Sequence, residues 1–247
     1  MTQIINYPLS STFAGVNKLQ ANGIIDTGNN LPNGIPGALV ISNSAMLATI
    51  NQSMTPTATG IRSEITMPAC TPTGEYWFYW EFMLPTGFAP LLDPIILMQI
   101  HTPDADPVNP IPFAFQYQQP GYLAISVPSQ TLPASGSSTT IVGSINPQYN
   151  HWYQACFHVN WQPNSNGFRE FFIDGQPLFR QYNVATTYND LGNGGNYFKV
   201  GCYDGTHNAR FGSCQMYVRN ANCWTGNDGY QQVMGRLPLP RTLLTAL

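Results

Sequence analysis

Seven polar side chains of this sequence could do chemistry together, because each shares a strand face with another of them. In an extended strand, residues two apart point to the same face. The seven come from three stretches, 61–65, 97–101 and 197–203, in which polar and apolar residues alternate. They are Arg62, Glu64, Gln99, His101, Tyr197, Lys199 and Tyr203.

The residue types in this set suit proton transfer beside the carboxylate of an acidic sugar. Arginine and an amide can bind and partly neutralise such a carboxylate, which acidifies the neighbouring C5 proton. Tyrosine or histidine can remove that proton, and tyrosine can return one to the departing glycosidic oxygen. Each stretch alone is equally typical of the polar face of a half-exposed sheet, so the prediction depends on the three together.

The elements that must position these residues are strands. Apolar and aromatic runs of four to ten residues recur between turn residues, whereas helical periodicity is weak and favours at most short turns near 86–92 and 227–234. An Asp-Gly pair at 174–175 predicts a tight hairpin. The pattern predicts an all-β fold, a jelly-roll β-sandwich of the concanavalin A-like type with two antiparallel sheets. The predicted strands are 38–42, 61–67, 75–84, 94–101, 112–117, 121–127, 139–145, 151–161, 168–173, 178–182, 196–203 and 213–219.

The composition excludes several classes of protein. Among the 247 residues, 43% are hydrophobic and only 9% are charged, with a formal net charge of −3. A nucleic-acid-binding protein usually carries a basic face, and this chain has two lysines and no basic run. Its apolar runs are shorter than the ~20 residues of a membrane helix. We therefore expect neither a nucleic-acid nor a membrane partner, and the sequence does not predict an oligomeric state.

The cysteines and the N-terminal sequence say little about location. Five cysteines leave at least one thiol without an intramolecular partner, and one or two disulfides stay open. No basic segment followed by an apolar stretch begins the chain, so no signal peptide is visible. The Gly-, Pro- and Asn-rich composition is typical of secreted and virion surface proteins, and we expect one of these locations.

The three stretches resemble, in order, three conserved blocks of the jelly-roll polysaccharide lyases. Alginate lyases of this type carry Arg-Thr/Ser-Glu, Gln-Ile/Val-His and Tyr-Phe-Lys-Ala-Gly-x-Tyr blocks, which are similar to 62–64, 99–101 and 197–203. The intervening stretch 151–175 looks more like the glucuronan lyase and heparin-lyase-like branch. The resemblance runs from about 60 to 205. Because no repeat and no long linker divides the sequence, we expect a single catalytic domain over 1–247.

The resemblance implies cleavage of a polyuronate by β-elimination, without a required cofactor. By position, Tyr203 would be the catalytic base and acid, and His101 its partner. Gln99 and Arg62 would neutralise the uronate carboxylate. Glucuronan or another glucuronate-containing glycan is the first expected substrate and alginate the second, because an Asp-Gly pair follows Tyr203 where alginate lyases often carry Gln.

Three further residues receive binding roles from the same resemblance. Lys199 and Tyr197 would line the subsites for the acidic polysaccharide, and Glu64 would hold Arg62 in place. Some relatives hold a structural calcium ion, but the sequence contains no clear calcium loop and we expect no metal ligands. Asp104 and Asp106 are better explained by Asp-Pro turns than by calcium binding.

Two other functions stay open at this point. The first is a non-catalytic carbohydrate-binding module with the same fold. The second is a glycoside hydrolase, which needs a pair of carboxylates at the site. Three remaining histidines have simpler interpretations: His151 and His158 as packing or edge residues of an aromatic strand, and His207 as a solvated loop residue.

Overall fold

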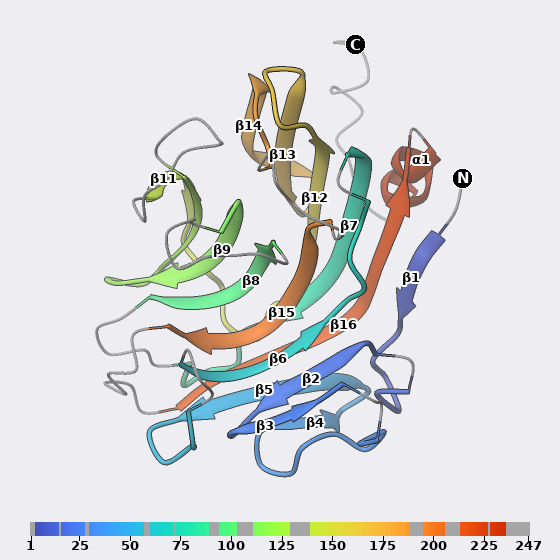
Figure 1. Ribbon diagram of the computed structural model, residues 1–247. Helices are drawn as coiled ribbons and strands as arrows, with labels where there is room; N and C mark the ends of the chain where they lie inside the picture. Colours follow the sequence, from blue (N-terminus) through green and yellow to red (C-terminus); the bar gives the residue numbers. More distant parts are fainter. Residues whose placement is uncertain are drawn as a thin grey trace.

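The computed structural model describes residues 3–14, 16–27, 30–56, 60–71, 73–88, 94–102, 111–128, 139–187, 195–205, 213–226 and 228–235. Within them the chain forms two antiparallel sheets that pack face to face (Figure 1). The predicted two-sheet β-sandwich is confirmed.

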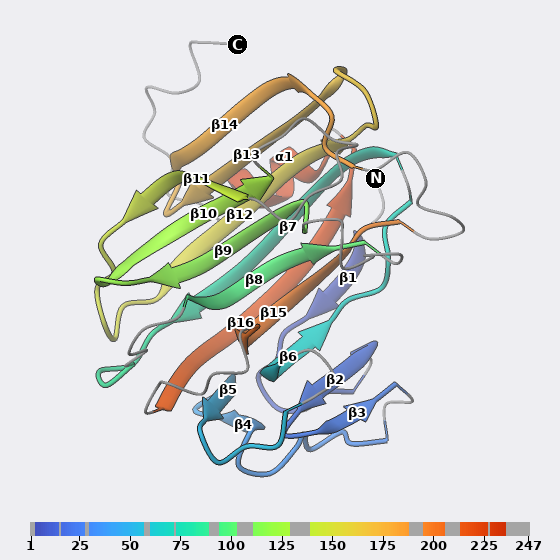
Figure 2. The same ribbon diagram turned by 60° about the vertical axis from the view of Figure 1, so that its left-hand side comes forward.

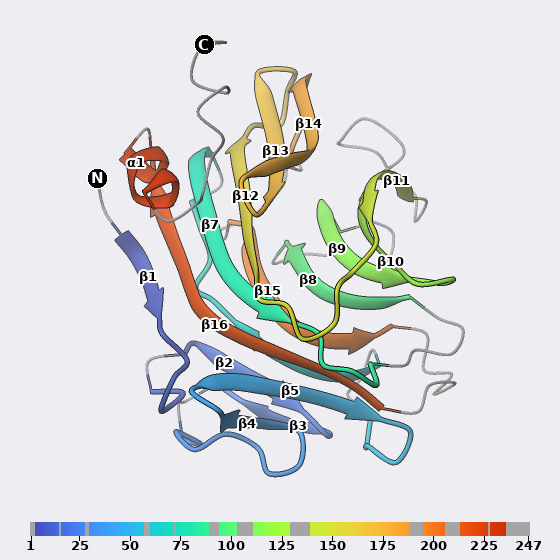
Figure 3. The same ribbon diagram turned by 180° about the vertical axis from the view of Figure 1, so that it is seen from behind.

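The first sheet combines strands from the N-terminal, middle and C-terminal parts of the chain. In order across the sheet they are β14 (Gln176–Val184), β13 (Gly167–Ile173), β12 (Tyr153–Trp161), β7 (Gly74–Met83), β16 (Ser213–Thr225), β5 (Ala45–Asn51) and β4 (Leu39–Ser42), with β1 (Gln3–Tyr7) also paired to β16. Seen from behind, β12, β7 and β16 run side by side, and the helix α1 (Asp228–Met234) lies beside the ends of β7 and β16 (Figure 3).

The second sheet holds the three strands with the candidate residues. In order across the sheet its strands are β11 (Thr139–Ile145), β10 (Tyr122–Pro128), β9 (Phe113–Gln118), β8 (Ile95–His101), β15 (Tyr197–Asp204), β6 (Ile61–Thr66), β2 (Lys18–Ala21) and β3 (Ile24–Asp26). Because β15 lies between β8 and β6, the sheet brings three distant parts of the chain together.

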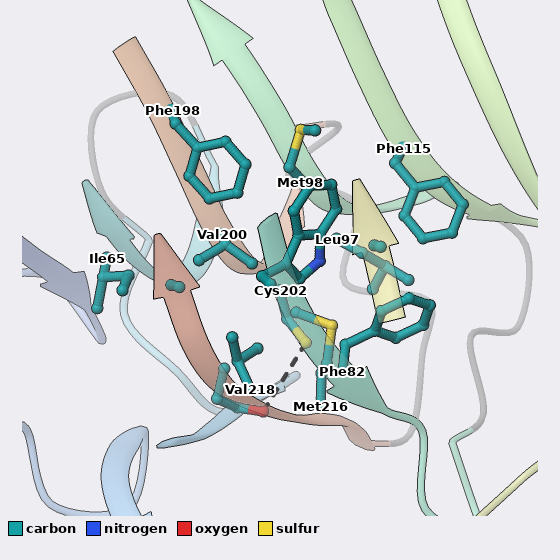
Figure 4. Close-up of a cluster of buried hydrophobic side chains, with 14 of the residues drawn as sticks. Ile65, Phe82, Leu97, Met98, Phe115, Phe198, Val200, Cys202, Met216 and Val218 are labelled. Atoms are coloured by element: carbon teal, nitrogen blue, oxygen red, sulfur yellow. Dashed lines mark hydrogen bonds between the residues drawn. The ribbon is translucent and has the colours of Figure 1, made fainter. Parts of the chain in front are cut away.

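The alternation in β15 decides which side chains enter the core. Phe198, Val200 and Cys202 point into the space between the sheets, where they meet Met98 of β8 and Phe82 of β7 (Figure 4). Burying large apolar side chains contributes roughly 1.5–3 kcal/mol each. Because every second residue of β15 is fixed in the core, the intervening residues must point to the other face of the sheet.

All twelve predicted strands and the hairpin are confirmed. Asp174 and Gly175 join β13 to β14 with positive φ angles of 49° and 76°, as a tight primed turn requires. A helix forms at the predicted second position, as α1. The strands β1, β2, β3 and β5 were not predicted. Three of them have five residues or fewer, too short for a clear alternating pattern.

The cysteines are all buried, and none is in a disulfide. The bridges that the sequence left open are therefore absent from this structure. The one helix in the described part of the chain is too short to cross a membrane.

Candidate active site

The seven candidate side chains lie together because the register of three neighbouring strands aligns them. Tyr203 of β15 lies directly opposite Arg62 of β6. On its other side, β15 places Lys199 opposite Gln99 and Tyr197 opposite His101. Directly opposite residues of an antiparallel pair point to the same face. These side chains lie on the face of the second sheet that points away from the core, which we call the site face. Figure 2 shows the strands of this sheet.

Glu64 connects the three strands at the centre of the site face. Its Oε2 lies 2.9 Å from Nζ of Lys199 and 3.5 Å from Nη1 of Arg62. Nε2 of Gln99 donates a hydrogen bond of 2.8 Å to Oε1 of the same carboxylate. All four side chains are buried. One carboxylate of β6 therefore fixes a cation of β15, a cation of β6 and an amide of β8.

Tyr203 is packed against the cations of this cluster. The guanidinium carbon of Arg62 lies 4.1 Å from the centre of the Tyr203 ring, and Nζ of Lys199 lies 6.0 Å from it. Cations within about 6 Å of an aromatic face are attracted by its quadrupole. A Cβ atom at Gly205 would lie 3.2 Å from the phenol oxygen of Tyr203. The glycine therefore leaves space beside the oxygen that proton transfer would use.

His101 is held in one tautomer at the end of β8. Its Nδ1 lies 2.6 Å from the carbonyl oxygen of Thr102 and 3.1 Å from Oη of Tyr197. A carbonyl oxygen only accepts hydrogen bonds, so in the neutral ring Nδ1 carries the proton and Nε2 keeps its lone pair. No residue in the described ranges hydrogen-bonds Nε2 of His101. His101 is therefore able to accept a proton at Nε2.

The site favours a charged Glu64 and a neutral His101. Burial pushes the pKa of Glu64 upward, but Lys199, Arg62 and the hydrogen bond from Gln99 outweigh it and hold the pKa below its ordinary value. Burial, the largest effect on His101, lowers the pKa of its ring. Burial also lowers the pKa of the Lys199 ammonium, although the Glu64 carboxylate acts in the opposite direction.

The seven side chains share one face of the sheet, as predicted. The contacts among them differ in part from those expected. Glu64 does contact Arg62, but its shorter contacts are with Lys199 and Gln99. The ring of His101 stacks on Tyr197 with centroids 5.2 Å apart, whereas Tyr203 lies farther along β15 beside Arg62. The direct neighbour of His101 is thus Tyr197, a residue that the sequence placed only in the subsites.

A pair of carboxylates does not form at the described part of this site. On the site face of β6, β8 and β15, Glu64 is the one carboxylate, and it is already bound to two cations and an amide. Glu75 and Glu170 do approach each other, but on the outer face of the first sheet, where both bind His158. The described residues of the site face therefore do not form the carboxylate pair that a glycoside hydrolase needs.

The other histidines and aspartates considered above lie elsewhere. His158 is buried in the first sheet, stacked on Trp77 with ring centroids 3.5 Å apart, so it is a packing residue as predicted. His151 lies at the exposed turn beside Asp174, 3.2 Å from its Oδ2. The remaining residues in question fall outside the described ranges: Asp104, Asp106 and His207.

Comparison with known proteins assigns the chain to a family. Residues 40–224, about three quarters of the chain, match the sequence model of the family described as polysaccharide lyase. A comparison with curated proteins finds no significant match.

Solved structures of lyases share the fold. The endo-β-1,4-glucuronan lyase from the fungus Trichoderma reesei has a TM-score of 0.64 at 16% identity, covering 91% of this chain and 96% of that one. A variant of the family 7 alginate lyase A1-II′, in complex with substrate, has a TM-score of 0.65 at 18% identity, with 89% and 94% covered. Alginate lyase PA1167 from Pseudomonas aeruginosa has a TM-score of 0.60 at 13% identity, with 88% and 99% covered.

These structures establish the jelly-roll fold of the chain, and the family match covers β6, β8 and β15, the three strands of the site. The protein is a polysaccharide lyase and belongs to that family.

Proposed function

We propose that this lyase cleaves a polyuronate by β-elimination at the site face, with glucuronan or another glucuronate-containing glycan as substrate and alginate as the second choice. The observation that carries the proposal is the position of Glu64, which holds two cations and an amide beside Tyr203. Glucuronan and alginate lyases are among the proteins of similar structure, which supports an acidic polysaccharide as the substrate class.

Arg62 and Gln99 would neutralise the uronate carboxylate. The amide of Gln99 has two N–H donors and gives one to Glu64. No residue in the described ranges accepts the other, which would bind a substrate oxygen. The guanidinium of Arg62 has five N–H donors and contacts Glu64 with one nitrogen atom. Donors fixed in advance around a developing negative charge stabilise it at no further cost in reorganisation. The C5 proton of the bound uronate is acidified as a result.

Tyr203 would transfer the proton. Its ionised oxygen takes the C5 proton, the electrons of the C–H bond form the C4–C5 double bond, and the C4–O bond breaks. The Tyr203 hydroxyl then returns the proton to the departing glycosidic oxygen. The positive charges of Arg62 and Lys199 over the ring favour the phenolate that begins this cycle. His101, with Nε2 unprotonated, is the second proton acceptor of the site.

The substitution Tyr203→Phe tests these roles, with Tyr182→Phe as a matched control. Tyr182 is exposed on β14 of the other sheet, so its substitution removes the same atom far from the site. We expect Tyr203→Phe to lose at least about 100-fold in kcat and to bind polyuronate oligosaccharides as well as the parent protein does. Tyr182→Phe should keep its activity. A Tyr203→Phe protein with full turnover would contradict the proposal, and a parent protein that binds without cleaving would favour the carbohydrate-binding module.

A further inference from the structure

The two lysines of the chain lie in the same row of the second sheet. Lys18 of β2 is directly opposite Thr66 of β6, and Thr66 is directly opposite Lys199 of β15. Opposite residues share a face, so Lys18 points to the same site face as Lys199. Two strand spacings separate their Cα atoms, which is about 10 Å. The chain thus places its only two lysines in one row of the site face, with Thr66 between them.

Lys18 differs from Lys199 in having no counter-charge among the residues that the structure describes. Lys199 is buried and lies 2.9 Å from Glu64. Lys18 is only partly buried, and it forms no ion pair with any residue in the described ranges. Its charge is nevertheless felt at the site, because it helps to lower the pKa of Lys199. An unpaired cation at the border of a site can bind an anion of the ligand.

The charge on the site face is one-sided. The strands β2, β6 and β15 bring three cations, Lys18, Arg62 and Lys199, against the single carboxylate of Glu64. The strands on the other side of β8 bring uncharged side chains to this face. In their described residues, Ala114 lies opposite Gln99, and Ser126 lies opposite Ala114. Among the described residues, the excess positive charge therefore extends from the centre of the site toward β2 and not toward β9, in a chain whose net charge is −3.

From this arrangement we infer that Lys18 is a specificity-determining residue that binds a second carboxylate of the polymer, beyond the one at Arg62 and Gln99. The inference rests on the proposed function and deepens it. The cations follow one another across the strands, so the polymer crosses the strands as well. A uronate is therefore preferred on the β2 side of the cleaved bond, whereas the uncharged β9 and β10 side also accepts a neutral sugar.

The test compares Lys18→Met, which keeps the length and removes the charge, with Lys18→Arg, which keeps the charge. Arg180→Met is the matched control, because Arg180 is exposed on β14 of the other sheet and its loss changes the net charge equally. The probe is glucuronan, or alginate if glucuronan is not cleaved. Initial rates give KM and kcat, and calorimetry with oligosaccharides of the same polymer on the Tyr203→Phe background gives Kd without turnover.

We expect Lys18→Met to raise KM and Kd about two- to fivefold, as the loss of one partly exposed ion pair implies. The kcat should stay within about twofold, Lys18→Arg should restore KM, and added salt should weaken binding less in Lys18→Met than in the parent. Equal KM and Kd for Lys18→Met and Arg180→Met would overturn the inference while the proposed function stands. If the parent forms no unsaturated product from any polyuronate, the proposed function fails, and the Kd comparison still decides the role of Lys18.

Discussion

Glu64 and Lys199 form a buried ion pair with 2.9 Å between Oε2 and Nζ, and the side chains are 1% and 4% exposed. Taking two charges out of water is costly, and a buried pair compensates for that cost only when further hydrogen bonds satisfy it. Gln99 supplies such a bond to the carboxylate. The arrangement is therefore stable as a whole and sensitive to the loss of any one member.

Replacing Glu64 by Gln should destabilise the protein and inactivate it. The substitution keeps the shape of the side chain but leaves Lys199 and Arg62 without their counter-charge. Breaking a buried pair in this way costs about 3–5 kcal/mol. Urea unfolding at constant m-value measures the loss. Glu81→Gln is the control, because its partner Arg219 is 39% exposed and a smaller loss is expected. An equal loss in both variants would show that the buried Glu64 cluster contributes no more stability than the partly exposed Glu81–Arg219 pair.

The rate of elimination should fall on acidification as His101 becomes protonated. Burial lowers the pKa of His101 from its ordinary value of 6.5, so the ring is neutral at pH 7 and able to accept a proton. The profile of kcat/KM should show an acid limb with an apparent pKa below 6.5. His101→Gln should remove this limb and lower the plateau. An unchanged limb in that variant would assign the titration to another group.

The carboxylates Glu75 and Glu170, on the outer face of the first sheet, should make the free energy of unfolding depend on pH in acid. A hydrogen bond from His158 lowers the pKa of Glu75, and His158, Tyr182 and Arg180 lower that of Glu170 despite the opposing effect of burial. In the folded protein the pKa values of both carboxyl groups lie below the ordinary value of 4.5. As the pH falls, these groups therefore bind protons in the unfolded chain before they do so in the folded protein. This stability is present above pH 4.5 and lost as the pH falls through the folded values.

The substitution His158→Gln tests this explanation. It should lower the free energy of unfolding at pH 6 by about 2 kcal/mol and make Tm less dependent on pH below 4.5. Because His158 lies in the first sheet, the kcat of the folded variant at pH 7 should match that of the parent. A variant with the parent's acid dependence of Tm would contradict the assignment to this cluster.

Gly201 is required by the close approach of β15 to β6. Its φ is +147°, and a Cβ atom there would lie 2.0 Å from the carbonyl oxygen of Ser63. Gly201→Ala must therefore move β15 away from β6 and disturb the contacts of Tyr203 with Arg62. We expect a loss of more than about 2 kcal/mol of stability together with most of the activity. Gly37→Ala is the control, because Gly37 also has a positive φ but nothing lies near its missing Cβ. If Gly201→Ala lost no more stability and activity than Gly37→Ala, β15 and β6 would be able to move apart without cost, which contradicts this explanation.

Strand alternation predicted the faces of the site strands correctly. In β15, Phe198 and Val200 are in the core and Lys199 is on the site face, because a strand cannot bury both faces in the same core. The chemistry-bearing residue types, together with the resemblance to the lyase blocks, selected residues that the structure places on one face. The Asp-Gly pair located the hairpin because its positive φ angles are a local property.

The contacts between strands could not be predicted in the same way. The shortest contacts of Glu64, with Lys199 and Gln99, depend on β15 lying between β6 and β8, and strand order is a long-range property. The stacking of His101 on Tyr197 depends on the register of β15 with β8. The placement of Lys18 on the site face was not predicted, because β2 has only four residues and its pattern carried no signal.

Elimination at a uronate leaves a conjugated double bond in the product, and a panel of polyuronates tests whether this protein forms it. Glucuronan, alginate blocks, hyaluronan, heparosan and pectate are each incubated with the protein. The ultraviolet absorbance of the conjugated double bond and the number of reducing ends are followed in parallel. We predict that both signals rise together on glucuronan or, next, on alginate. New reducing ends without absorbance would mean hydrolysis and would contradict the roles of Tyr203 and Arg62.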